Sequence, residues 1–553
     1  MSSVVGLVHK TWNGSKSMTY QNSATPLELP GSGQTRQHTR DSSTQLGQAR
    51  QRLPINLLSN FVWLVVNMGV NLWYTPYLIA HLGVSAYGLV PLAGSVTSYM
   101  TVLTTALNDA ISRFLTIDLA KKDLDAANRT FNTAIVSSLI VIALLLPVAL
   151  VISWFGPQIF NIPPGHEQDA QWLLLLSTMT FLTTTFASTF AVSSYAQHRF
   201  DLRLLVNTVR LGAQLVTVVL LFNLLTPSLW QAGLGMLVSA FLLLLGHREL
   251  WRKLTPELTL KLGLFDQPLL KQFMAFSGWV LVNSMGAMLF LNIDLIVANL
   301  IFGPEVAGRY GAVVIFPSVL RAVAGTANAV LVPIVMTLYA QGNLSGLARF
   351  SRLSVKSMGL MVALPIGLLC GLGKPLLTVW LGPEFSDLSP LVVALVAHLC
   401  INLAVSPLFS LQVATNKVRV PALVTLAMGL ANAALAVSLS LWTGWGYISI
   451  AIAGAIVLIM KNALFTPLYN ARILGLSWWA FLPALGTSVV GCLSAGAMAY
   501  LISLNWSLTG WVQLISACAL VSVAYLVAVF FLGLSADDRR FLKSEMQRRM
   551  KHE

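Results

Sequence analysis

Long apolar runs constrain the fold of this chain more than any other feature of its sequence. A helix needs about 20 mostly apolar residues to cross the roughly 30 Å hydrocarbon core of a bilayer. Runs of that length recur between charged or Gly- and Pro-rich breaks, and fourteen of them are predicted as transmembrane spans. The predicted spans are residues 55–79, 88–108, 131–153, 171–194, 204–223, 228–246, 273–301, 309–337, 354–372, 388–411, 420–441, 446–470, 479–503 and 509–533.

Backbone chemistry decides the fold class of these spans. The bilayer interior offers no partners for N–H and C=O groups, so spans of this length must be helical, and the shorter alternating segments of a barrel are absent. Of the 553 residues, 56% are hydrophobic and only 10% are charged, with a mean hydropathy of +0.74, which excludes an ordinary soluble protein. We therefore predict an all-α polytopic membrane protein with 14 transmembrane helices.

The basic residues follow a pattern that orients the spans. A net charge of +14 could indicate nucleic-acid binding, but 29 of the 34 Lys and Arg residues fall in the two termini and in alternate loops. The intervening loops hold only Arg309 and Lys374. This alternation is the positive-inside rule and predicts that both termini are cytoplasmic. It also makes a nucleic-acid partner unnecessary.

Two halves of the sequence repeat one another. Gly83 and Gly88 lie in "HLGVSAYGLV", and Gly303 and Gly308 lie in "IFGPEVAGRY", each 220 residues later. Keeping that offset pairs Met68 with Met288, Ser98 with Ser318, Asn108 with Asn328 and Arg129 with Arg349. Six spans in each half is an even number, so the repeats are predicted to be parallel, with a substrate path between them.

The repeat predicts how the chain is organised. The segment that joins the halves and the C-terminal tail each mix basic and apolar residues at near-helical spacing, so each is expected either at the membrane surface or as a solvated helix. The predicted regions are a disordered cytoplasmic arm at 1–52, an N-lobe at 53–250, a cytoplasmic interfacial connector at 251–272, a C-lobe at 273–472, two extra spans within 473–535 and a basic cytoplasmic tail at 536–553.

Polar side chains within the first span form a stripe. Asn56, Asn60, Asn67, Asn71 and Tyr74 fall on one helical face at 100° per residue. An unsatisfied polar group facing lipid costs on the order of several kcal/mol, so this face is not expected to meet the bilayer. The stripe either lines a substrate cavity, which we favour, or supplies hydrogen bonds between helices.

Three cations are predicted within spans. Arg321 lies near the middle of its span, with Tyr310 and Asn328 about on the same face. A cation at that depth costs about 2.5–3.5 kcal/mol, so it should face water, an anion or a partner, and a guanidinium suits phosphate oxygens. Arg321 is predicted to bind substrate, with a structural ion pair as the alternative. Arg210 and Lys461 are further cavity candidates, although Arg210 is also placed to snorkel.

A carboxylate within the seventh span, Asp294, needs a separate explanation. It shares a face with Asn283, whereas Asn292 and Asn299 share roughly the opposite face. Three roles remain open: a counter-ion for Arg321, a site that couples transport to protons or sodium, and a packing residue bonded to the backbone.

The sequence contains no catalytic constellation. The cysteines show no metal-binding spacing and are expected to be packing residues: Cys370, Cys400, Cys492 and Cys518. One histidine, His398, is isolated in a span, and four are predicted in loops: His81, His166, His198 and His247. No phosphate loop of the GxxxxGK[ST] type occurs, which argues against ATP as direct fuel. We expect no enzyme activity, cofactor or metal.

Four stretches together carry a family resemblance. These are "NDAISRFLTIDLAKKDLDAANRTFNTA" at 108–134, "NIDLIVANLIFGPEVAGRYGAVVIF" at 292–316, "VPIVMTLYAQGNLSGLARF" at 332–350 and "LTVWLGPEFSDLSPLVVAL" at 377–395. In this order they resemble the polysaccharide transporter branch of the multidrug/oligosaccharidyl-lipid/polysaccharide exporter superfamily. The resemblance extends over about residues 53–535 and includes the fourteen spans in two lobes.

The resemblance implies a function that composition does not. It implies a flippase in the bacterial inner membrane that moves an isoprenoid-pyrophosphate-linked oligosaccharide from the cytoplasmic to the outer leaflet by alternating access. The implied partners are this glycolipid, membrane lipids, and the polymerase and chain-length components of a polysaccharide pathway. A cation-coupled multidrug exporter of the same superfamily is the alternative. A membrane glycosyltransferase or polymerase is a third reading, disfavoured because the predicted outer loops are short and acid-poor.

Overall fold

A computed structural model describes residues 58–197 and 199–533, and every regular element in these ranges is helical. The predicted N-terminal arm, the whole predicted C-terminal tail, Asn56 and His198 lie outside the described residues. Within these ranges, twelve helices are long and apolar enough to cross a membrane, or thirteen when the bent helix α9 is counted as one span. A further helix covers residues 58–82, so the structure is compatible with the predicted fourteen spans.

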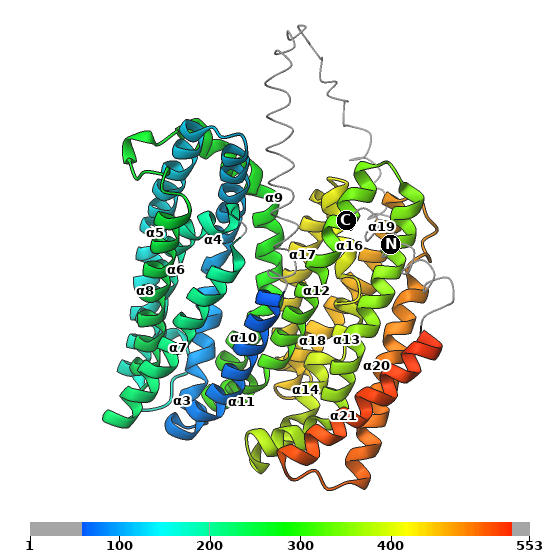
Figure 1. Ribbon diagram of the computed structural model, residues 1–553. Helices are drawn as coiled ribbons and strands as arrows, with labels where there is room; N and C mark the ends of the chain where they lie inside the picture. The colour runs from blue at the N-terminus through cyan, green and yellow to red at the C-terminus, as the bar shows by residue number, and fades with distance from the viewer. Residues whose placement is uncertain (1–57, 198, 534–553) are drawn as a thin grey trace. The chain divides into compact units, whose positions relative to one another are not determined.

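The helices follow one another with short connections (Figure 1). The first half contains the helix at 58–82, α3 (Val84–Tyr87), α4 (Leu89–Ala120), α5 (Leu124–Ile159), α6 (Glu167–Ala196), α7 (Phe200–Leu224) and α8 (Leu229–Leu254). The second contains η1 (Leu262–Leu264), α9 (Gln267–Leu291), α10 (Ile293–Phe302), α11 (Pro304–Val313), α12 (Ile315–Ala340), α13 (Leu344–Trp380), η2 (Pro383–Leu388), α14 (Ser389–Val396), α15 (Leu399–Asn402), α16 (Ser406–Ala414), α17 (Arg419–Trp442), α18 (Ile448–Ile459), the π-helix η3 (Met460–Phe465) and α19 (Thr466–Ile473). The chain ends with α20 (Leu482–Asn505), α21 (Trp511–Ala528) and η4 (Val529–Gly533).

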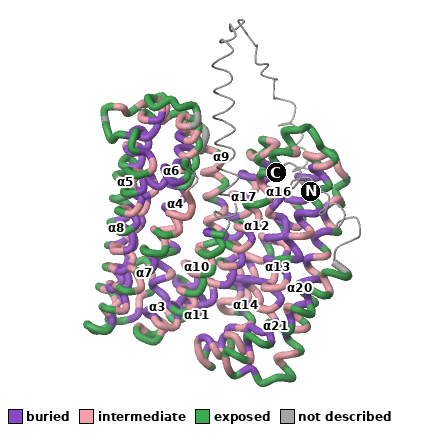
Figure 2. Tube along the Cα trace, viewed as in Figure 1, coloured by how far each residue is buried: buried purple, intermediate pink, exposed green. Residues whose placement is uncertain are grey.

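Each half folds into a helical lobe. In the N-lobe, the helix at 58–82 through α8, helix α6 packs against α8, α5 and α4. In the C-lobe, α9 through α19, α17 packs against α9 and α18, and α12 packs against α13 and α16. Figure 2 shows buried positions along the inner faces of both bundles, while α5 and α21 expose large apolar side chains, as helices facing lipid do.

The repeat is visible in the backbone. Gly83 and Gly303, which precede α3 and α11, have φ angles of 78° and 87°. Residues 122 and 342 also repeat a left-handed conformation, although the first is a lysine and the second a glycine. The next residue caps a helix in both lobes: the Asp123 side chain accepts from the Ala126 N–H, and that of Asn343 from the Gly346 N–H. All three pairs keep the predicted offset of 220.

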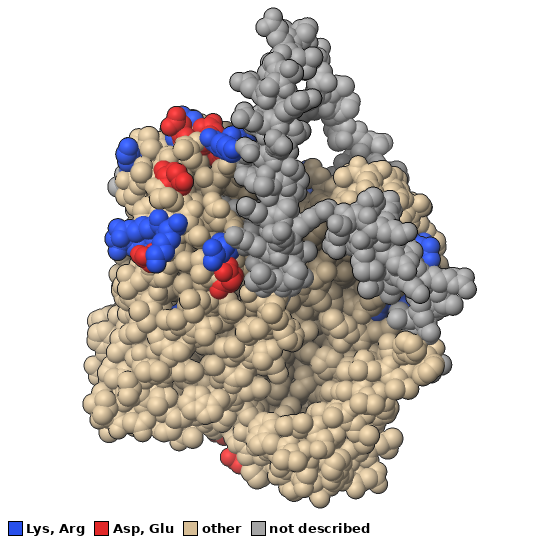
Figure 3. All heavy atoms as spheres, in the orientation of Figure 1, with Lys and Arg blue, Asp and Glu red and all other residues tan. Residues whose placement is uncertain are grey.

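The two ends of the lobes differ in charge. We call the end with the turns before α5, α7, α9, α13 and α17 the basic end, and the other the opposite end. On the face seen in Figure 3, Lys and Arg side chains gather toward the basic end and a broad uncharged band lies below them. This band is what a membrane-spanning surface requires, because charged groups avoid hydrocarbon.

The lobes meet closely at the opposite end. Helix α3 contacts α11, and a Cβ atom added to Gly88 would lie 2.6 Å from the Gly308 backbone nitrogen. A Cβ atom added to Gly308 would overlap the carbonyl of Val84. Each of these repeat-related glycines thus lies against the other lobe, and only glycine allows the backbones to approach so closely.

Polar contacts reinforce this junction. The Asn161 side-chain amide donates to the Asn299 carbonyl at 2.7 Å, and the Asn299 amide donates to the Asn161 carbonyl at 2.9 Å. The Asn161 backbone N–H also donates to the Asn299 side-chain oxygen at 2.9 Å. On the other side, the Trp380 indole donates to the Leu72 carbonyl at 2.6 Å. A loop of the N-lobe is therefore bonded to α10, and the end of α13 is bonded to the first helix.

Helix α9 contacts both lobes. Its two parts, Gln267–Met274 and Gly278–Leu291, meet at an angle of 47°. Phe273 is fully buried in the N-lobe cluster that includes Leu115 and Phe131, whereas the second part packs against α17 in the C-lobe. The bend is thus the place where the chain passes from one lobe to the other.

The segment between α8 and α9 is attached to the N-lobe. The Asn128 side chain accepts from the Thr259 N–H at 2.8 Å and donates to the Glu257 carbonyl at 3.1 Å. Asn132 accepts from the Lys261 N–H at 2.7 Å and donates to the Thr259 carbonyl at 2.9 Å. Two amides of α5 therefore satisfy successive backbone groups of this segment, much as a neighbouring strand would.

Several predicted boundaries were wrong. The seventh predicted span is broken at Asn292, whose φ of −127° and ψ of −11° end α9, whereas the eighth lies within one continuous apolar stretch, Pro304–Ala340. Asparagine favours helix ends because its side chain competes with the backbone for hydrogen bonds. His81 and His247 lie in helices rather than in loops. A helix can continue beyond the membrane where charged side chains meet water, and in α8 Glu249 and Lys253 form an ion pair there at 3.2 Å.

The last two spans pack on the C-lobe. Helix α20 lies along α13, where Gly367 faces Ala495 and Gly371 faces Ala499, so the two backbones come close. Helix α21 then packs on α20 and α13. In Figure 1 these helices lie on the side of the C-lobe away from the N-lobe.

Candidate functional site

A polar cluster lies in the C-lobe where the seventh span is broken. Because α10 begins directly after Asn292, Asp294 is in the first turn of that helix, where a carboxylate is stabilised by the helix dipole. The Tyr310 hydroxyl of α11 donates to the Asp294 Oδ2 atom at 3.0 Å. Tyr310 is fully buried, and the Asp294 Oδ1 atom has no partner among the described residues.

Arg321 of α12 belongs to the same cluster without closing an ion pair. It is near enough to Asp294 and Tyr310 for electrostatic interaction, yet it forms no hydrogen bond or salt bridge with a described residue. The side chain is half-buried. Its N–H donors thus remain available to a ligand, while the Asp294 carboxylate partly balances the charge from a distance.

A histidine that sequence reasoning left isolated lies beside Arg321. His398 is 7% exposed, its Nδ1 atom contacts the Ala394 carbonyl at 3.1 Å, and its Nε2 atom has no partner among the described residues. It is close enough to Arg321 to interact electrostatically. No spacing in the sequence could have indicated this, because Arg321 of α12 and His398, in the turn between α14 and α15, are far apart along the chain.

The cluster borders the N-lobe. Helix α4 contacts α10, and Tyr99 of α4 is within electrostatic range of Asp294. The Tyr99 hydroxyl has no hydrogen-bond partner among the described residues. The carboxylate and guanidinium therefore lie next to the junction between the lobes, where a substrate path was predicted.

The first helix carries its predicted polar stripe. Asn60 is exposed, and Asn67 and Asn71 are half-buried. The Asn71 amide donates to the Asn67 carbonyl at 2.8 Å and to its side-chain oxygen at 3.1 Å. Tyr74 is buried, and its hydroxyl lacks a partner among the described residues. Asn71 therefore bonds to Asn67 of its own helix rather than to a neighbouring helix.

The remaining predicted residues are dispersed. Asn328 is half-buried on α12, with no described partner for its side-chain oxygen. Lys461 is 9% exposed in the π-helix η3, and its ammonium lies 5.2 Å from the Phe409 ring centre without an ion pair to a described residue. Arg210 belongs to α7 in the N-lobe, and its Nε atom is buried without a described partner. The structure thus groups Arg321 with Asp294 and leaves Arg210 in the other lobe.

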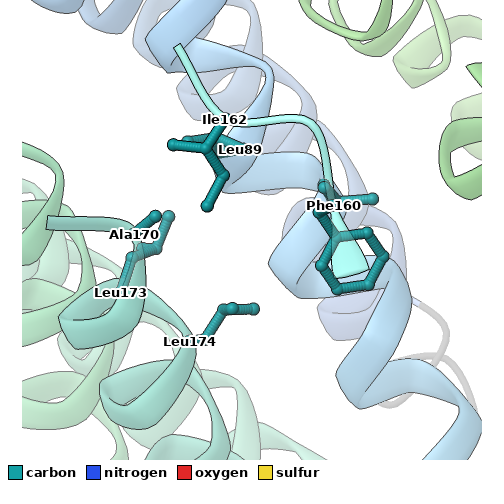
Figure 4. A pocket seen from close by; sticks show the side chains of 7 residues that line it. Leu89, Phe160, Ile162, Ala170, Leu173 and Leu174 are labelled. Atoms are coloured by element: carbon teal, nitrogen blue, oxygen red, sulfur yellow. The ribbon is translucent and has the colours of Figure 1, made fainter. Parts of the chain in front are cut away.

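A small pocket elsewhere does not suit a polar cargo. It lies beneath the α5–α6 connection and is lined only by apolar side chains, seen in Figure 4: Leu89, Leu92, Phe160, Ile162, Ala170, Leu173 and Leu174. With no hydrogen-bonding side chain, it is a packing gap of the N-lobe. Within the described ranges, His, Cys, Asp and Glu form no group of three that could hold a metal ion.

Known proteins resemble the chain in sequence and fold. Residues 55–338 match the family described as "Polysaccharide biosynthesis protein". The "Uncharacterized membrane protein EpsK" of Bacillus subtilis (strain 168) is 32% identical over 495 residues, covering 89% of this chain and 97% of that protein.

Two solved structures share the fold at low identity. An inward-facing multidrug resistance MATE family transporter of the MOP superfamily aligns with a TM-score of 0.59 at 14% identity, covering 76% of this chain and 98% of that one. The lipid II flippase MurJ, in an inward closed conformation, aligns with a TM-score of 0.59 at 12% identity, covering 86% and 98%. With this fold and these sequence matches, the chain belongs to the polysaccharide biosynthesis protein family of multi-pass membrane transporters.

Proposed function

We propose that this protein is a flippase that moves an isoprenoid-pyrophosphate-linked oligosaccharide across the bacterial inner membrane by alternating access of its two lobes. The single observation that carries the proposal is Arg321, a half-buried guanidinium with no ion pair or hydrogen bond to a described residue. A cation at membrane depth is expensive unless water or an anion meets it. A pyrophosphate supplies that anion, in a geometry that guanidinium recognises.

The membrane topology follows from the charges. The basic end faces the cytoplasm and the opposite end faces outward, which places both termini in the cytoplasm. With α3 and α11 in contact and Asn161 bonded to Asn299, the molecule is closed on its outer side. The glycolipid headgroup enters from the cytoplasmic leaflet between the lobes, while its isoprenoid tail stays in the bilayer.

Alternating access then needs a change at the outer junction. Opening this junction separates Gly88 from Gly308 and breaks the bonds between Asn161 and Asn299. The pyrophosphate bound at Arg321 is released outward once that end is hydrated, because water competes for its hydrogen bonds. Asn60, Asn67 and Asn71 present amides to the sugars along the path, and Asn328 and Lys461 extend the polar lining on the C-lobe side.

Asp294 has a different role from Arg321. It tunes the field around the guanidinium as a counter-ion, through the fixed geometry given by Tyr310. The same unpaired Oδ1 atom makes Asp294 the candidate site for coupling to protons or sodium. A cation-coupled multidrug exporter is the second candidate function, favoured by the fold shared with the MATE transporter.

A reconstituted flipping assay tests the proposal. Liposomes containing the purified protein and a fluorescent isoprenoid-pyrophosphate-linked sugar are treated with a membrane-impermeant quencher. We expect quenching to spread from the outer leaflet to nearly all of the probe, whereas protein-free liposomes protect the inner leaflet. Protection in both samples, together with ethidium efflux from protein-containing liposomes, would replace the flippase by the drug exporter.

A further inference from the structure

Helix α7 carries a polar stripe that the sequence analysis did not single out. Four polar side chains recur at spacings of four, three and four residues, which places them on one helical face: Arg203, Asn207, Arg210 and Gln214. The opposite face exposes large apolar side chains, as a lipid-facing surface does: Leu205, Val209, Val216 and Leu220. The stripe therefore faces the protein rather than the bilayer.

The stripe begins at the basic end of α7. At the opposite end, α7 packs against the first helix. Phe222, near the end of α7, packs against Tyr77 with ring centres 5.9 Å apart and against His81 at 5.6 Å. Arg203 is one turn from the start of α7, and Arg210 lies two turns deeper. The two guanidinium groups thus form a series that leads from the basic end into the N-lobe.

These cations are not neutralised within the described residues. Arg199, at the start of α7, pairs with Asp201 at 2.9 Å. Arg203 only stacks over the Tyr195 ring, at 4.3 Å from its centre, and Arg210 forms no ion pair or hydrogen bond with a described residue. The Arg210 Nε atom is nevertheless buried. A buried guanidinium without partners is unfavourable unless it binds an anion or water.

A buried imidazole completes the arrangement. His247 of α8 is 5% exposed, its Nδ1 atom contacts the Ala187 carbonyl at 3.3 Å, and its Nε2 atom has no described partner. Arg203 and Arg210 are both within its electrostatic range, and no described carboxylate is. Gly246 permits this proximity, since a Cβ atom there would lie 2.6 Å from the Val206 Cγ1 atom of α7.

We propose that Arg203, Arg210 and His247 form a phosphate-binding site in the N-lobe, which holds the phosphate group of a lipid presented at the basic end. The two guanidinium groups supply several N–H donors to phosphate oxygens, and the His247 Nε2 atom adds one when the bound anion holds the imidazole protonated. If the phosphate belongs to the cargo pyrophosphate, the inference rests on the proposed function. The cargo then binds first at this site and afterwards at Arg321 of the C-lobe. A phospholipid headgroup carries the same chemistry.

Binding to the purified full-length protein tests this site. In phosphatidylcholine nanodiscs titrated with farnesyl pyrophosphate, we expect Arg210→Gln to weaken binding about tenfold, as the loss of one charge-assisted hydrogen bond does. Arg203→Gln and His247→Gln should weaken it as well, and Arg210→Lys should retain part of it. Arg199→Gln, whose arginine is already paired, and Arg248→Gln, exposed next to His247, are the matched controls and should bind as wild type does.

Thermal stability separates binding from a structural role. An unpaired buried cation carries a desolvation penalty, so Arg210→Gln should not lower the melting temperature. A lower melting temperature with unchanged affinity would instead make Arg210 structural and overturn the proposal. The proposal would also be overturned if Arg203→Gln, Arg210→Gln and His247→Gln all bound farnesyl pyrophosphate with wild-type affinity.

A second preparation identifies the source of the phosphate. In phosphatidylglycerol nanodiscs, native mass spectrometry counts the lipids that remain bound. Retained phosphatidylglycerol that is lost in Arg210→Gln identifies a phospholipid headgroup, whereas farnesyl pyrophosphate binding alone identifies the cargo; either supports the site. If the wild-type protein flips the glycolipid and the variants bind phosphate as well as it does, the site is refuted and the flippase function stands. If the site binds phosphate but the wild-type protein does not flip the glycolipid, the site stands and the flippase function is refuted.

Discussion

The N-lobe and the C-lobe share a backbone but not a chemistry. The left-handed glycines before α3 and α11, the left-handed residues 122 and 342 and the caps of α5 and α13 all recur after 220 residues. At the same offset, Tyr74 replaces Asp294, Val90 replaces Tyr310 and Thr101 replaces Arg321. The features that shape helix ends are duplicated, whereas the charged cluster occurs once.

This difference separates what the fold needs from what the cargo needs. Turns and close backbone contacts must match in both lobes for the halves to pack about a common axis. Side chains along the path do not have to match, and the C-lobe presents Asp294 and Arg321 where the N-lobe presents amides on its first helix and cations on α7. In the proposed transport cycle, a headgroup between the lobes would meet two unlike walls.

The largest expected effect comes from removing the Arg321 charge, which has no counterpart at the corresponding N-lobe position, Thr101. Arg321→Ala should reduce flipping in liposomes by roughly 100-fold, since charge-assisted hydrogen bonds contribute about 1.5 to 3 kcal/mol each. Arg321→Lys should retain part of the activity because the charge remains without the planar fork. Thr101→Ala, at the corresponding N-lobe position, is the control and should stay near wild type. Equal losses at both positions would make the two walls equivalent.

The shared backbone predicts symmetric effects at the junction. Gly88→Ala and Gly308→Ala should each destabilise the closed outer end by about 1 to 3 kcal/mol, because the new methyl group meets backbone atoms of the other lobe. Thermal unfolding in detergent measures this change. Gly94→Ala is the control, since no atom lies within 4 Å of its added Cβ atom and alanine favours a helix. A loss at only one of the paired glycines would contradict the symmetry.

A smaller effect is expected at the amide pair. Asn161→Ala removes hydrogen bonds to α10 and should destabilise the junction by about 1 to 2 kcal/mol. Distances between spin labels at the outer ends of α4 and α10 should then shift toward longer values. Asn223→Ala makes a suitable comparison, because that amide bonds only to its own helix. An unchanged distance distribution would show that the pair does not hold this end closed.

The smallest effect is expected at a single amide of the first helix, because one neutral amide offers the sugars only a weak contact. Asn71→Leu introduces the residue found at the corresponding C-lobe position, Leu291, and removes that amide together with its two bonds to Asn67. Flipping should change by no more than about twofold, as substitutions outside buried networks usually do. A loss as large as that of Arg321→Ala would place a specific cargo contact on the N-lobe wall.

Sequence reasoning found the spans and the repeat because both depend on local patterns. The apolar runs and the glycines at fixed offset needed no knowledge of contacts. The break at Asn292 was missed because hydropathy does not register a change in backbone angles. The α7 stripe has helical spacing at Arg203, Asn207, Arg210 and Gln214, but it was obscured because Arg203 falls just outside the predicted fifth span.

Other features depend on tertiary structure. His398 beside Arg321, and Asn161 opposite Asn299, join residues that are distant in the chain, and no local pattern relates them. The pairing of Tyr310 with Asp294 needed the turn between α10 and α11 to be formed first. The roles of the predicted cavity residues remain predictions for the same reason, because they depend on a cargo rather than on the chain.

The amides of Asn128 and Asn132 have a mechanical consequence. They hold the segment between α8 and α9 against α5 from Glu257 to Lys261, so the backbone of this stretch cannot extend when the lobes move. Any swing of one half against the other must then be taken up further along, at the elbow of α9. Inserting residues into the segment at 257–261 is therefore expected to leave the movement of the lobes unchanged, whereas a rigid bend in α9 is expected to prevent it.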